Sequence, residues 1–146
     1  MFSGRSEIKI LAWKDFRDQL TNWPEDILTV SKEWAKAPLS NIYLAYDHID
    51  KWPDAWTLIS DGIYCDISVA LGMFYTLYYS NYSQKDTMKI ECYKLTDRHE
   101  IVNLVNLEYG KYMLNWSVGE AVNILSLGAL PKPMHTIFAQ DLPIKR

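Results

Sequence analysis

Hydrophobic residues recur at helical spacing along the first 80 residues, in three main stretches. Side chains three and four positions apart share one face of an α-helix, so each stretch predicts an amphipathic helix. The third stretch has the widest apolar stripe and is expected to be the central helix of the fold. A weaker pattern at 42–49 predicts another short helix, which the segment KWPDAW at 51–56 interrupts. The apolar positions are Trp13, Phe16 and Leu20, then Ile27, Val30 and Trp34, then Ile67, Ala70, Leu71, Phe74, Leu77 and Tyr78.

The period changes to two after residue 87, which is typical of β-strands. Residues 88–92, 99–107 and 112–118 predict three strands, and 121–130 predicts either a further strand or a short helix. The last segment, 131–146, has no clear pattern and is expected to be an irregular tail.

The segment EYGK at 108–111 predicts a hairpin turn between the second and third strands. Simple pairing across this turn places Asn115 near Leu104, and His99 near Glu120. The register alone therefore does not bring the side chains of His99 and Asn115 together.

These elements predict an α+β fold in a single domain over residues 1–146. Its helical part covers about 1–80 and its antiparallel sheet about 87–130. The helices come before the strands in the sequence, so we expect them to pack on one face of the sheet, with a central cysteine-bearing helix against it.

Composition narrows the classes of partner. The net charge is −3 and the Lys and Arg residues are scattered, so we expect no nucleic-acid binding. The longest apolar stretch, about 69–79, is shorter than the roughly 20 residues of a membrane span. Only two cysteines occur and no apolar leader follows Met1, which predicts a soluble, intracellular and cytoplasmic protein with reduced thiols.

The aromatic content is high, with 6 Trp and 10 Tyr among 146 residues. One small core does not bury so many rings completely, so part of this surface is expected to meet a partner or line a cleft. The candidates for a cleft wall or interaction surface are Trp52, Trp56 and Tyr64.

Cys65 stands where a turn gives way to the central helix, and two interpretations of it stay open. A cysteine on a helix is often a small core residue. At a helix N-terminus, however, the unpaired N–H groups and the helix dipole favour an anion, which lowers the pKa of a thiol and makes it a nucleophile. Cys92, on an alternating strand, is expected to be a core residue.

A nucleophilic cysteine needs a base and a group that orients the base. His99 opens the second predicted strand and Asn115 lies in the third, although each also has a simple structural interpretation at a strand end or on a solvated strand. His48 and His135 lack partners at ligand spacing, and neither CxxC nor HExxH occurs, so no metal or other cofactor is expected.

The order Cys65, His99, Asn115 resembles the transglutaminase-like branch of the papain-like cysteine enzymes. The separations of 34 and 16 residues are similar to those of its compact bacterial cysteine proteinases. The segments KWPDAWTLISDGIYCD, RHEIVNLV and YMLNWS resemble the segments that carry the cysteine, the histidine and the third residue. The resemblance implies a papain-like α+β core in which these three residues are catalytic.

The chain departs from this family at three places. Gly62 lies three residues before Cys65, where the family usually has Gly-x-Cys. Asn115 stands where Asp is more common. No Gln precedes the cysteine to complete an oxyanion hole, so the resemblance leaves the backbone N–H of Cys65, with Trp56 or Tyr64, to donate there.

Two functions from different classes follow. The first is a thiol hydrolase or acyltransferase that acts on a peptide or amide bond of a peptide or protein substrate. The second is a catalytically inactive domain of the same fold that serves in protein assembly. For this second function, the WP…W segment and the CD…ALGMFYTLYYS helix of the sequence resemble uncharacterised products of tailed-phage genomes. This resemblance implies a bacteriophage structural protein of the virion. The oligomeric state has no sequence signal.

Overall fold

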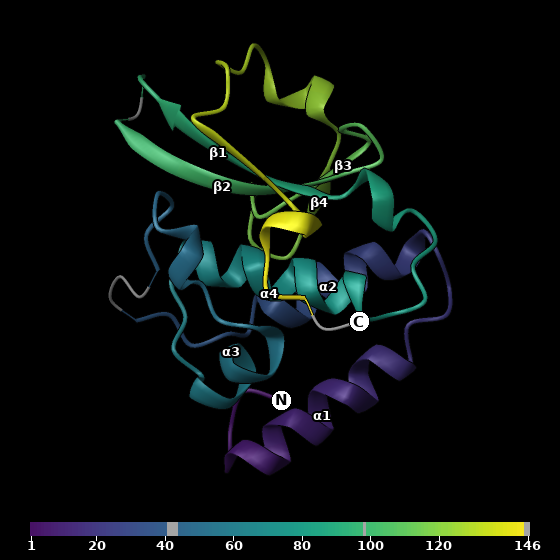
Figure 1. Cartoon of the computed structure of the whole chain (residues 1–146). Helices are drawn as coiled ribbons and strands as arrows, with labels where there is room; N and C mark the ends of the chain where they lie inside the picture. Colours follow the sequence, from purple (N-terminus) through teal and green to yellow (C-terminus); the bar gives the residue numbers. More distant parts are fainter. Residues whose placement is uncertain (41–43, 98, 145–146) are drawn as a thin grey trace.

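The computed structural model describes residues 1–40, 44–97 and 99–144. Within these ranges the helices lie on one face of an antiparallel sheet, as the α+β prediction requires (Figure 1). The helices are α1 Ser6–Asp18, α2 Glu25–Trp34, α3 Ala55–Asp61 and α4 Asp66–Tyr78, with short 3₁₀ turns at Ile49–Lys51, Lys85–Thr87, Ile124–Leu127 and Ala139–Asp141. The strands are β1 Lys89–Leu95, β2 Glu100–Leu107, β3 Tyr112–Leu114, β4 Ala121–Val122 and β5 His135–Phe138.

The strand order is β4-β3-β2-β1-β5, and each neighbouring pair is antiparallel. The hairpin predicted at 108–111 is confirmed, because β2 and β3 pair Val105 with Leu114 and Leu107 with Tyr112. The same register, continued one step, sets Asn115 opposite Leu104, as the sequence predicts.

Helix α4 lies at the centre of the molecule, between the sheet and the other helices (Figure 1). Every residue from Ile67 to Leu77 is buried. A helix that is apolar on all sides is stable only inside a core, so α4 is the element on which α1, α2, α3 and the sheet all pack. The prediction of a central helix is confirmed.

The outer face of the sheet has a small core of its own. Its buried residues are Tyr93, Leu95, Leu104 and Met113, and the chain between β4 and β5 covers them with Ile124, Leu127 and Leu130. The segment predicted as a strand or a short helix contains both, since β4 is followed directly by a 3₁₀ turn.

Two elements were not expected. The segment 51–56 does not remain irregular, because Asp54 accepts a hydrogen bond from the backbone N–H of Thr57 (2.8 Å) and so caps α3. The last segment is not an irregular tail, because β5 pairs with β1 along 135–138. Of the helix expected at 42–49, residues 42 and 43 lie outside the described residues, and 44–48 form no helix.

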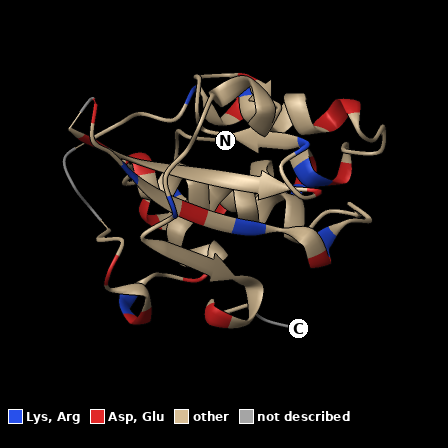
Figure 2. Cartoon of the chain, turned by 90° about the horizontal axis from the view of Figure 1, so that it is seen from above, with Lys and Arg blue, Asp and Glu red and all other residues tan. Residues whose placement is uncertain are grey.

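Acidic and basic residues are interspersed over the elements instead of forming one charged face (Figure 2). Every helix in the described ranges falls short of the length and apolar character that a membrane span requires.

Candidate active site

Cys65 is the N-cap residue of α4, in extended backbone (φ −123°, ψ −177°), and its side chain is partly exposed. The thiol therefore lies at the positive end of a 13-residue helix. The buried hydroxyl of Ser68 holds it there: Ser68 Oγ accepts from the backbone N–H of Cys65 (2.6 Å) and lies 3.5 Å from Sγ. That N–H, expected as an oxyanion donor, is engaged within the helix cap.

A mostly apolar hollow of about 360 Å³ opens beside the thiol and is here named the Cys65 groove. It lies between the first turn of α4, the chain around residue 45 and the start of β2. Besides Cys65 and Asp66, it is lined by Leu44, Ala45, Tyr46, Ile67, Ile101 and Asn103.

Asp66, the first residue of α4, joins the helix to two strands. Its carboxylate accepts from the amide Nδ2 of Asn103 on β2 (2.8 Å) and from Nδ2 of Asn115, just after β3 (3.1 Å). The Asn115 amide also donates to the backbone carbonyl of Asn103 (2.9 Å). Burial raises the pKa of Asp66, although both amides act in the opposite direction. We call Asn103, Asp66 and Asn115 the Asp66 clasp.

His99 does not open a strand. It lies in the turn between β1 and β2 with a left-handed backbone (φ 52°), and β2 begins one residue later. The positive φ ends the extended pairing, whose last pair is Leu95 with Glu100. His99 is exposed and lies outside the set of described residues that line the Cys65 groove.

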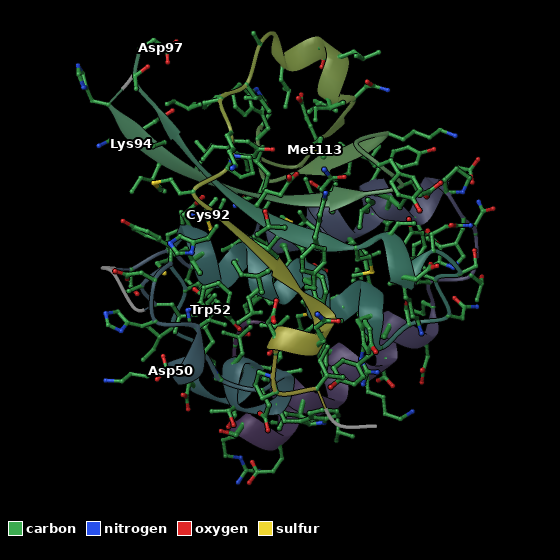
Figure 3. The ribbon with its side chains drawn as sticks, turned by 45° about the horizontal axis from the view of Figure 1, so that its top comes forward. Asp50, Trp52, Cys92, Lys94, Asp97 and Met113 are labelled. Atoms are coloured by element: carbon green, nitrogen blue, oxygen red, sulfur yellow. The ribbon has the colours of Figure 1, made fainter. Side chains whose placement is uncertain are left out.

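The ends of β1 and β2 on either side of this turn lie away from the helices (Figure 1). Asp97, in the same turn as His99, lies at the outer end of the hairpin, on the far side of Cys92 from Trp52 (Figure 3). The structure therefore gathers Cys65 and Asn115 around Asp66, whereas His99 lies two residues before Ile101, the first of the two β2 residues that line the groove.

The three aromatic candidates are more buried than expected. Trp52 is 4% exposed, and its indole N–H donates to the carbonyl of Ala45 (2.8 Å) beside the Cys65 groove. Trp56 is half-buried and packs edge-on against other rings. Tyr64 is fully buried and so offers no surface, because successive side chains of the extended backbone at 64–65 point in opposite directions.

The sequence pattern alone does not identify Asp66 and Asn103 as site residues. An acidic residue in the first helical turn is common and by itself indicates only a favourable helix start. The sequence does contain an indication of a role for Asn103. It is the one polar residue among the alternate positions 101–107, which otherwise hold Ile101, Val105 and Leu107 and share one face of β2. A polar side chain on the core-facing side of a strand needs a buried partner.

No family model and no curated protein matches the sequence. Solved structures do match it. Legionella pneumophila LapG superposes with a TM-score of 0.70 and 16% identity, over 94% of this chain and 78% of LapG. Calcium-bound LapG gives 0.71 over the same shares, and EGTA-treated LapG gives 0.70 over 94% and 76%. The chain therefore shares the transglutaminase-like α+β fold of LapG.

Proposed function

We propose that the protein is a thiol hydrolase or acyltransferase that acts on a peptide or amide bond, with Cys65 as its nucleophile. One observation carries the proposal: a partly exposed thiol caps a buried helix and opens on a groove. The fold similar to that of LapG supports it. The substrate we expect is a peptide or protein segment in the Cys65 groove.

In this proposal Sγ of Cys65, as a thiolate, attacks the carbonyl carbon of the scissile bond and forms a C–S bond. The C–N bond breaks, and the leaving amine takes the proton that His99 removed from the thiol. Water or a second amine then attacks the thioester, loses its proton to His99 and regenerates the thiol. Asn115 is the third residue. The β1–β2 turn must carry the imidazole of His99 over Ile101 toward Sγ.

The proposed mechanism includes no step on a metal ion. LapG has been observed calcium-bound. Across residues 1–40, 44–97 and 99–144 of this chain, no group of three or more His, Cys, Asp or Glu side chains is placed to hold a metal ion. The side chains in these ranges therefore do not form a site of this kind.

A second candidate function is peptide binding without chemistry, as in a catalytically inactive assembly domain, including one of a phage virion. The composition of the side of the Cys65 groove that β2 forms favours this binding function. Ile101 and Asn103 supply that side, and no histidine is among the described lining residues. A groove of this kind holds an apolar segment without cleaving it.

The pH dependence of Cys65 alkylation by iodoacetamide, read by mass spectrometry, tests the proposal. Cys92 is the internal reference, because burial raises the pKa of its thiol to about 12. For an activated thiol we expect the rate to reach its plateau well below the ordinary thiol pKa of about 8.5. The plateau should move to higher pH in His99→Ala and stay in place in His48→Ala, a matched exposed histidine.

A profile typical of an ordinary thiol, unchanged in His99→Ala, contradicts the enzyme and leaves the binding function. If the thiol is activated, incubation with an activated ester should add one acyl group to Cys65. The mass of the tryptic peptide that holds Cys65 shows whether this occurs.

A further inference from the structure

The side chains of Asp66, Asn103 and Asn115 meet where α4 begins. In their hydrogen bonds the carboxylate is the acceptor and the two amides are the donors. A carboxylate only accepts hydrogen bonds, whereas an amide Nδ2 only donates them. Asn103 and Asn115 both present Nδ2 to Asp66. The Asn115 amide has the backbone carbonyls of Asp66 (3.3 Å) and Asn103 (2.9 Å) as its other neighbours. Every contact of that amide nitrogen is thus with an acceptor.

This arrangement explains why residue 115 is an asparagine. An aspartate there would set its carboxylate against that of Asp66 and against two carbonyl oxygens, without a hydrogen to share. The backbone of Asn115 is left-handed (φ 73°), a conformation that Asn tolerates better than most residues, and it turns the amide out of β3 toward α4. The carboxylate at this site therefore lies on the helix.

We propose that Asp66 is a positioning residue of the Cys65 site: its carboxylate holds the amides of Asn103 and Asn115 and so fixes the first turn of α4 on the sheet. Cys65 is the adjacent residue, so its orientation in the groove depends on this clasp. The part that concerns Cys65 reactivity rests on the proposed function, whereas the clasp itself does not.

The charges around Asp66 determine how the clasp responds to pH. Glu100, at the start of β2, raises the pKa of Asp66 beyond the effect of burial. Cys92, on β1, faces Asp66, and its thiol is held neutral by burial and by that carboxylate. Cys65 is adjacent in sequence, Tyr46 lines the same groove, and the clasp partners from β2 and β3 are neutral amides. With its pKa raised in the folded state, Asp66 favours folding below its unfolded pKa, and this contribution is lost as the pH rises through the folded pKa.

The first measurement uses the unaltered protein. A pH titration followed by NMR should move the side-chain amide signals of Asn103 and Asn115 together, with one midpoint above the ordinary Asp value of about 3.9. Asp66→Asn should abolish this shared midpoint. Amide signals that titrate separately, or not at all, would overturn the clasp whether or not Cys65 proves to be activated.

The second measurement follows the rate of Cys65 with a dipyridyl disulfide in Asp66→Asn, Asn115→Asp and the double exchange. Asp66→Asn removes the charge and one acceptor from the clasp, and Asn115→Asp sets two carboxylates face to face, so we expect each rate to fall at least about tenfold as the thiol loses its position. The double exchange again pairs an amide with a carboxylate, but its carboxylate at 115 still faces the backbone carbonyls of Asp66 and Asn103, so it should react faster than Asn115→Asp without reaching the wild-type rate. Single variants as fast as wild type, or a double exchange no faster than Asn115→Asp, refute the positioning role.

Glu91→Gln is the matched control. Asn106 Nδ2 donates to Oε1 of Glu91 (2.6 Å), a buried amide and carboxylate pair on the opposite face of β2. We expect this variant to lower stability without changing the Cys65 rate. A pH profile of an ordinary thiol for Cys65 in the wild type would contradict the proposed function. The NMR titration of the two amides and the rates of the exchanged variants would still test the clasp.

Discussion

The first turn of α4 and its last two turns belong to one helix but differ in how their polar groups are satisfied. In the later part, Thr76 Oγ1 accepts from the indole N–H groups of Trp13 (3.0 Å) and Trp34 (2.9 Å), and all three residues are fully buried. At the start, Cys65 and Asp66 are held by side chains from the helix cap and the strands, beside an open groove.

The difference separates stability from function along one helix. The part packed against the tryptophan rings is fully buried, so its contacts serve the fold. The first turn has a partly exposed thiol, a carboxylate bonded to two amides and an adjacent hollow, so its contacts position the reactive groups. Three substitutions test this division, and we expect them to have progressively smaller effects on stability.

Thr76→Val should have the largest effect, because it leaves two buried indole N–H groups without their acceptor. We expect the free energy of unfolding to fall by about 3 kcal/mol, since each orphaned donor costs roughly 1–3 kcal/mol. Urea unfolding followed by tryptophan fluorescence measures it. Thr29→Val, at an exposed hydroxyl on α2, is the control and should stay within about 0.5 kcal/mol of wild type. Equal effects at the two sites would contradict the division.

Gly72→Ala should come next, because a methyl group at this position overlaps the indole ring of Trp34. We expect a loss of about 2 kcal/mol from overpacking. Helix propensity alone predicts the opposite sign, a gain of about 1 kcal/mol. Thermal unfolding therefore decides between the two effects. In a Trp34→Leu background the same change should be far less costly, which a double-mutant cycle measures.

Ser68→Ala should have the smallest effect on stability, about 1 kcal/mol, because it removes the helix-cap hydrogen bonds between the Ser68 hydroxyl and Cys65. Its effect on Cys65 should be clear, since Ser68 holds both the N–H and the thiol. Ser80→Ala is the control at the other end of α4, where Ser80 Oγ donates to the carbonyl of Leu77 (2.6 Å). The two variants should be similar in stability, while only Ser68→Ala changes the alkylation rate of Cys65. If both change it, the two ends of the helix are not separable.

Local patterns were sufficient for several parts of the fold. The apolar stripe from Ile67 to Tyr78 predicted α4, because a helix needs only contacts three and four residues apart. The turn at 108–111 sets the register of β2 and β3, because the pairing of a hairpin is determined by the few residues of its turn. Cys65 at the start of α4 followed directly from where that pattern begins.

Other features depend on partners that are distant in the sequence. Strand β5 has little alternation of its own and exists because β1 offers it an edge. His99 has a left-handed backbone conformation, which the neighbouring residues in the sequence do not predict.

The Asp66 clasp joins residues 37 and 49 positions apart. Short-range periodicity was therefore sufficient to predict the central helix, the hairpin and the place of the thiol. The side chains that surround the thiol depend on long-range packing, because the carboxylate of Asp66 selects its donors by their position in space.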